Sequence, residues 1–119
     1  MSRPLKVLVA NELRSYREAY AEALRGLRPD VEVRAALPGD IDRMIDLFHP
    51  DLVLCSEPTP KIEREVQAWI QFYPSEEPTM LVFTYGDVST VAPAELETLL
   101  TIVDRSRESL NDYEQPWSL

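Results

Sequence analysis

Four short polar residues stand where apolar runs of this sequence end, and their side chains could do chemistry: Asn11, Glu12, Ser56 and Thr84. If the runs before them are parallel strands, their carboxyl ends meet at one edge of a sheet. That edge is where open α/β sheets bind ligands. The functional interpretation is a pocket that holds a ligand or an ion. The alternative is that short polar residues simply end strands well, and the residue types alone leave both open.

Nucleophilic catalysis has little support in the same residues. Ser56 and Cys55 are possible nucleophiles and His49 is the one histidine. His49 and Ser56 would lie at opposite ends of one strand, about 20 Å apart. A serine hydroxyl without a neighbouring base is not activated. We therefore expect no enzyme, a turn role for His49 and a core role for Cys55.

The chain alternates short apolar runs with helical periodicities, which predicts an α/β fold with a parallel sheet. We expect one domain over residues 1–111 and a tail over residues 112–119, which suits a chain of 119 residues. The spacing of apolar residues predicts four strands and four helices. The strands are expected at 7–10, 31–35, 52–56 and 80–84, and the helices at about 13–28, 41–48, 62–73 and 93–111.

Composition limits the partners. The formal charge is −9, with 21 acidic and 12 basic residues, so nucleic acid and anionic membrane surfaces are disfavoured. No apolar run approaches the roughly 20 residues that span a bilayer. The single cysteine cannot form an internal disulfide. We expect a cytoplasmic protein without a metal or cofactor.

Several short motifs follow one another in a characteristic order and spacing. They are Lys6-Val7-Leu8-Val9-Ala10-Asn11-Glu12, Tyr16-Arg17-Glu18, Pro50-Asp51-Leu52-Val53-Leu54, Ser56, Pro60 and Thr84. Together they resemble the receiver domain of two-component response regulators. The resemblance covers roughly residues 5–84 and implies a flavodoxin-like, three-layer α/β/α fold with parallel strands in the order 2-1-3-4. Ser56 falls on the family's phosphoacceptor position and Thr84 on its switch hydroxyl.

The departures from the family are informative. Phosphoryl transfer to a receiver needs a carboxylate nucleophile and a cation held by acidic side chains. Asn11, Glu12 and Ser56 supply a single carboxylate, and no lysine follows Lys61 to serve as the family's strand-five lysine. The resemblance therefore implies a degenerate receiver with a vestigial phosphoacceptor pocket. Glu57 could mimic a charged acceptor, but strand alternation predicts that it points away from Ser56.

The last third of the chain also departs from the family. After Thr84 only Tyr85-Gly86-Asp87 precede the next β-leaning piece, Val88–Val91. A parallel return needs a crossover of about a dozen residues or more, so this piece is either an antiparallel hairpin or a loop. The fourth-helix and fifth-strand region of a receiver is then truncated or remodelled.

That remodelling leaves apolar residues that could contact a partner. Leu96 and Leu100 on the last helix and Trp117 in the tail are the candidates, and a homodimer would cover them. Trp69, Phe72 and Tyr73 are expected to be mainly core, with Phe72 partly exposed, although an aromatic partner contact is the alternative.

The expected function is phosphorylation-independent protein–protein interaction in signal transduction or transcriptional regulation. The alternative is a small-ligand sensor that uses the pocket near Ser56.

Overall fold

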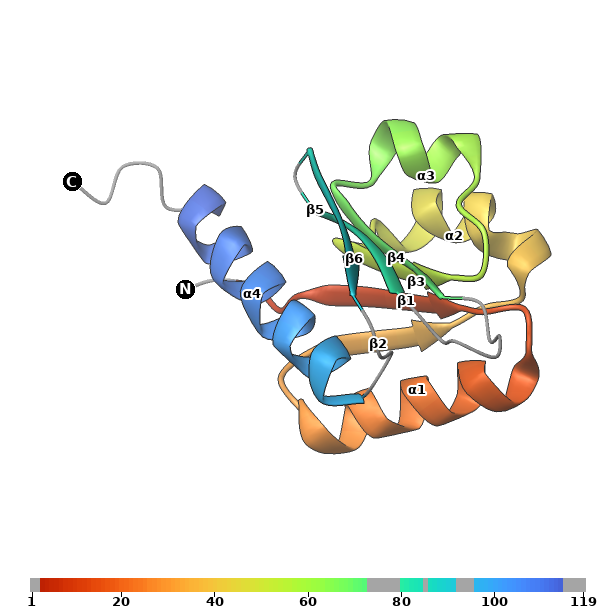
Figure 1. Ribbon diagram of the computed structural model, residues 1–119, viewed down its shortest axis with the longest axis horizontal. Coiled ribbons are helices and arrows are strands. Elements are labelled where there is room, and N and C mark those ends of the chain that lie inside the picture. Colours follow the sequence, from red (N-terminus) through yellow and green to blue (C-terminus); the bar gives the residue numbers. More distant parts are fainter. Residues whose placement is uncertain (1–2, 73–79, 85, 92–95, 115–119) are drawn as a thin grey trace.

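The computed structural model of the protein describes residues 3–72, 80–84, 86–91 and 96–114. It is an α/β protein in which helices cover both faces of one mixed sheet (Figure 1). In chain order its elements are β1 (Lys6–Ala10), α1 (Arg14–Leu27), β2 (Glu32–Ala35), the 3-10 helix η1 (Pro38–Asp40), α2 (Ile41–Phe48), β3 (Leu52–Cys55), α3 (Pro60–Glu65), β4 (Ala68–Phe72), β5 (Met80–Thr84), β6 (Asp87–Val91) and α4 (Leu96–Glu114).

The sheet has six strands in the order β2-β1-β3-β4-β5-β6. The four strands β2, β1, β3 and β4 are parallel, whereas β5 and β6 are antiparallel additions. The predicted parallel order 2-1-3-4 is therefore present, but its fourth strand is a different segment from the one expected. The sheet as a whole is only partly parallel, and a flavodoxin-like fold does not follow from it.

The prediction of one helix over residues 62–73 is wrong. Helix α3 ends at Glu65, and Ala68–Phe72 instead forms β4 beside β3, with Leu54 opposite Ile70. A strand that is buried on both faces loses its alternating pattern, so periodicity cannot separate it from a buried helix. Phe72 is consequently buried rather than partly exposed. Tyr73 lies outside the described residues.

The prediction of a parallel strand at residues 80–84 is also wrong in direction. β5 pairs antiparallel to β4, with Ala68 opposite Thr84 and Phe72 opposite Met80. β5 therefore runs back toward the amino ends of the parallel strands, and the side chain of Thr84 is carried there with it.

Of the two alternatives for the segment after Thr84, the structure has the hairpin. β6 pairs antiparallel to β5, and Thr84 lies opposite Asp87 across the turn. Gly86 has a φ of 95°, a left-handed conformation that glycine adopts without strain.

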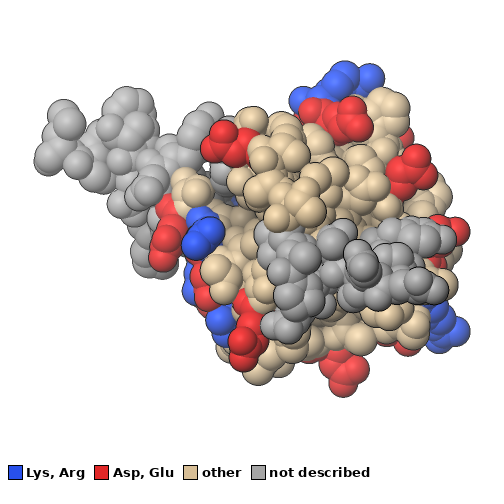
Figure 2. Space-filling model, in the orientation of Figure 1, with Lys and Arg blue, Asp and Glu red and all other residues tan. Residues whose placement is uncertain are grey.

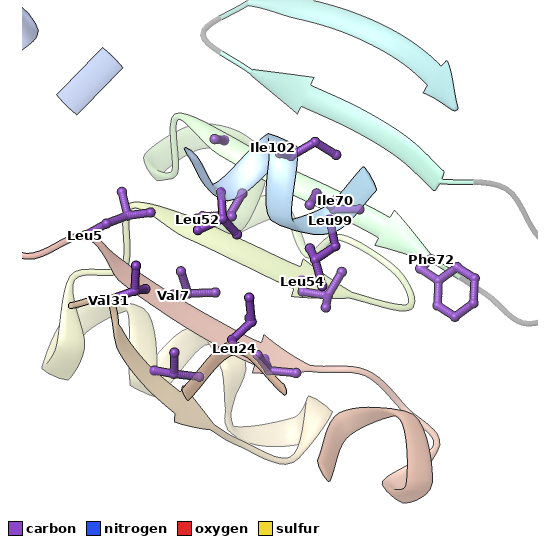
Figure 3. Close-up of a cluster of buried hydrophobic side chains, with 14 of the residues drawn as sticks. Leu5, Val7, Leu24, Val31, Leu52, Leu54, Ile70, Phe72, Leu99 and Ile102 are labelled. Atoms are coloured by element: carbon purple, nitrogen blue, oxygen red, sulfur yellow. The ribbon is translucent and has the colours of Figure 1, made fainter. Parts of the chain in front are cut away.

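Two buried clusters lie on opposite faces of the sheet. One cluster packs α1 and α4 against the sheet, and Figure 3 shows Leu99 and Ile102 of α4 among Leu52, Leu54 and Ile70. The other cluster packs α2 and α3 on the opposite face. Because the central strands contribute buried side chains to both clusters, they are covered on both sides, as parallel strands usually are.

Helix α4 extends past the expected domain boundary. It runs to Glu114, so residues 112–114 are helical, and residues 115–119 lie outside the described part. Two ion pairs tie α4 to the loop after α1. Arg28 donates two hydrogen bonds to the carboxylate of Asp104, and Arg107 donates one to the carboxylate of Asp30. Within the described part of the chain, no helix is both long enough and apolar enough to cross a bilayer.

Candidate functional site

Three of the four predicted site residues come together at the carboxyl ends of the parallel strands. Asn11 and Glu12 follow β1, and Ser56 follows β3, which is the neighbour of β1. The backbone N–H of Glu12 donates a hydrogen bond of 2.8 Å to the Ser56 hydroxyl oxygen. The Ser56 hydroxyl therefore joins two strand ends, and one of its acceptor positions is already used.

Thr84 does not belong to this group. Its backbone pairs with Ala68 at the start of β4, which is the end of the sheet opposite to Ser56. The cause is the reversed direction of β5, which the sequence did not predict. Thr84 instead lines a separate pocket beside Asp87 and Ser106.

Arg17 is a residue of this site that the sequence analysis missed. Its guanidinium donates hydrogen bonds to the backbone carbonyls of Asn11, at 2.9 Å, and of Glu12, at 3.3 Å. It thereby holds the loop between β1 and α1 in place. The position of Arg17 in the first turns of α1, soon after the polar pair, is the signal that could have identified it.

Asn11 is 1% exposed and incompletely satisfied. Its side-chain nitrogen donates a long hydrogen bond of 3.5 Å to the carbonyl of Phe72, and its side-chain oxygen has no partner among the described residues. The amide therefore spans the end of β3 toward β4 and links non-adjacent strands of the sheet.

A pocket of about 640 Å³ opens at this edge of the sheet. Its polar lining comes from Glu12, Arg17, Ser56, Glu57 and Thr59. Glu57 lines this pocket together with Ser56, and the direction of its side chain relative to Ser56 stays a prediction. Strand alternation does not apply there, since β3 ends at Cys55.

Acidic and metal-binding groups are sparse around the pocket. Among the described residues, no group of three or more His, Cys, Asp or Glu side chains could hold a metal ion. Glu12 and Glu57 are the carboxylates of the pocket lining, and both are exposed. The lining can offer hydrogen bonds and one guanidinium to a ligand.

The other candidate nucleophile, Cys55, is a buried thiol. Its burial, followed by the nearby charge of Glu57, raises the pKa of the thiol to about 12. The Sγ atom lies 3.7 Å from the carbonyl oxygen of Ile70, as expected for a core residue. His49 has a φ of 53° at the end of α2, which confirms its predicted turn role.

The predicted contact residues are divided. Leu96 is 37% exposed, whereas Leu100 is partly buried against the cluster beneath α4. Trp117 lies outside the described residues. Trp69 is 7% exposed and stacks on Phe83 with a centroid distance of 3.9 Å, so its predicted core role is confirmed.

The chain matches no protein-family model and no curated protein sequence. The geometry of its surfaces and pockets is therefore the basis for a functional proposal.

Proposed function

We propose that this chain is a cytoplasmic, receiver-like domain of flavodoxin type. In this proposal it acts through phosphorylation-independent protein–protein interaction in signal transduction or transcriptional regulation, and it works as a homodimer without enzymatic activity. The observation that carries the proposal is that β6 is the last strand at one side of the described sheet, beside the exposed apolar side chains of Leu81 and Val88.

The position of Ser56 supports the phosphorylation-independent part. Its hydroxyl oxygen accepts a hydrogen bond from the N–H of Glu12, and Ser56 as a whole is 9% exposed. The hydroxyl has no neighbouring base among its described hydrogen-bond partners. An alcohol in this setting lacks the carboxylate chemistry by which receivers take up phosphate.

The backbone of β6 supports the interaction part. In an antiparallel hairpin closed by two residues, the pair that flanks the turn is hydrogen-bonded and the pairs then alternate. Since Thr84 and Asp87 form the flanking pair, the N–H and C=O groups of Val88 and Thr90 point away from β5. Such an edge can accept another strand by backbone pairing.

One face of this hairpin carries two exposed apolar side chains, Leu81 and Val88. Val88 lies opposite Phe83, and Thr90 lies opposite Leu81. Val88 is 62% exposed and Leu81 is 39% exposed. The β6 edge also lacks lysine and proline, two residue types that commonly block pairing at sheet edges.

A second copy of the chain fits this edge. Two β6 strands can pair antiparallel about a twofold axis at Ser89, so that Val88 of each copy faces Thr90 of the other. Every outward backbone group at these positions would then be hydrogen-bonded. The apolar strips on the two copies would lie side by side and add hydrophobic contact.

Proline substitutions test this edge. Thr90→Pro removes an outward N–H that pairs with no described residue, so the variant should fold but be a monomer by light scattering at micromolar concentration. Ser89→Pro is the matched control, because its N–H pairs with β5 and its loss should lower the Tm. A Thr90→Pro variant that remains a dimer would remove the support for this interface.

The second candidate function is a small-ligand sensor. The observation in its favour is the pocket of about 640 Å³ beside Ser56 and Arg17. A thermal-shift screen of nucleotides and metabolites separates the two, since a ligand for this pocket would raise the Tm of the wild type and less so that of Arg17→Gln.

A further inference from the structure

One face of the β5–β6 hairpin carries small polar residues. Val82 lies opposite Ser89 and Thr84 lies opposite Asp87, so these four side chains share a face. Val82 belongs to the buried cluster that includes Leu99 and other α4 residues. The face that carries Thr84, Asp87 and Ser89 is therefore the one turned toward α4.

Helix α4 presents a matching stripe. Ile102, Arg105, Ser106 and Ser109 recur with the spacing that places residues on one side of a helix. These residues and the four hairpin residues line a partly open pocket of about 380 Å³. The pocket lies at the opposite end of the sheet from Ser56 and shares no residue with the pocket there.

The side chains explain why the space is open. Leu99, Ile102 and Val103 of α4 are buried and fill the gap between helix and sheet. Farther along the helix, the inward positions are the serines 106 and 109, which are too small to continue this packing. If only the stability of the core mattered, a large apolar residue would be expected at these positions, because protein interiors are close-packed.

The hydroxyl of Ser106 supplies a second, independent observation. Ser106 is 2% exposed, and its oxygen has no hydrogen-bond partner among the described residues. A buried hydroxyl without a partner destabilises a protein, so native structures rarely leave one unsatisfied. This hydroxyl lines the pocket, where a bound molecule can supply the missing partner.

The charges of the lining indicate the class of ligand. Asp87 and Arg105 both line the pocket, and neither forms an ion pair with another described residue. A guanidinium binds a carboxylate with two parallel hydrogen bonds, and a carboxylate binds an ammonium group. The volume lies near the lower limit for small-molecule sites in proteins.

We propose that the pocket between α4 and the β5–β6 hairpin binds a small zwitterion of the size of a free α-amino acid. Arg105 holds its carboxylate, Asp87 its ammonium group, and Ser106 donates to or accepts from the remaining polar atoms. This site is independent of the interaction edge of β6 and of the pocket beside Ser56.

Thermal unfolding of the wild-type chain with each of the standard free amino acids tests the proposal. Glycerol, glucose and acetate serve as neutral and purely anionic probes of the same lining. A fitting amino acid at about ten times its Kd should raise the Tm by roughly 5 °C. The three comparison probes should produce no comparable shift.

Three variants locate the binding. Arg105→Gln and Ser106→Ala should each reduce the apparent affinity for the amino acid at least roughly tenfold. Arg17→Gln, in the other pocket, should leave it unchanged. The proposal is overturned if no amino acid shifts the Tm, if a neutral polyol or acetate shifts it as much, or if both pocket variants bind like the wild type.

Discussion

Two buried serines in this protein have opposite situations. Ser56 accepts a hydrogen bond from the backbone of Glu12, whereas Ser106 has no partner among the described residues. Both residues are nearly inaccessible, at 9% and 2% exposure. A satisfied hydroxyl contributes to stability, whereas an unsatisfied one costs the free energy of its desolvation.

The two alanine variants should therefore differ. Ser56→Ala leaves the Glu12 N–H without its partner and should lower the free energy of unfolding by about 1 kcal/mol in urea titrations. Ser106→Ala removes an unpaired group and should leave the free energy of unfolding unchanged or raise it. Equal losses in both variants would contradict the assignment of their hydrogen bonds.

The elements of the first half of the chain were predictable from local pattern. The strand at 7–10, the helix after it and the strand at 52–56 each have a clear apolar run or stripe, and the structure contains them as β1, α1 and β3. The carboxyl-end position of Asn11, Glu12 and Ser56 followed from these elements. That part of the site needed no tertiary information.

The second half was not predictable in the same way. Ala68–Phe72 is a strand because it pairs with β3, and its sequence fits a helix about as well. The direction of β5 depends on this strand, since β5 pairs with β4 rather than with β3. The misplacement of Thr84, and the unforeseen pocket that it lines, both result from this one ambiguity.

At the level of elements, α4 depends on an ion-pair cluster near its middle. The carboxylate of Asp104 accepts two hydrogen bonds from Arg28, at 2.8 and 2.9 Å, and a weaker one from Arg107, at 3.3 Å. Hydrogen bonding to Arg28 holds the pKa of Asp104 below its usual value, and the charges of Arg28 and Arg107 add to this effect.

The lowered pKa predicts how stability depends on pH. A carboxylate whose folded pKa lies below its unfolded value contributes stability above the unfolded value, near 4, and loses it as the pH falls through the folded pKa. The Arg28–Asp104 pair is partly exposed, so its contribution is moderate. Asp104→Asn should therefore lower the Tm by roughly 2–4 °C at pH 7 and by less at pH 3.

Glu108→Gln on the same helix is the matched control for Asp104→Asn. It removes the same charge from an exposed residue without an ion pair among the described residues, and its effect on the Tm should be small at either pH. A loss for Asp104→Asn that persists undiminished at pH 3 would contradict the role of the Arg28–Asp104 pair.

At the level of the whole molecule, the charge and the surface have opposite effects on self-association. The formal charge of −9 disfavours contact between two copies, and the acidic residues are spread over the visible face rather than gathered in one patch (Figure 2). The β6 edge offers directional backbone pairing in addition to apolar contact. Higher ionic strength should therefore strengthen a dimer of this chain.

The most direct test of the central claim is the mass of the wild-type protein, measured by light scattering before and after incubation with acetyl phosphate and Mg²⁺. The account predicts twice the chain mass of 13.7 kDa at micromolar concentration in both samples, without covalent phosphate by intact mass spectrometry. A monomer that dimerises only when it becomes stoichiometrically phosphorylated would contradict it.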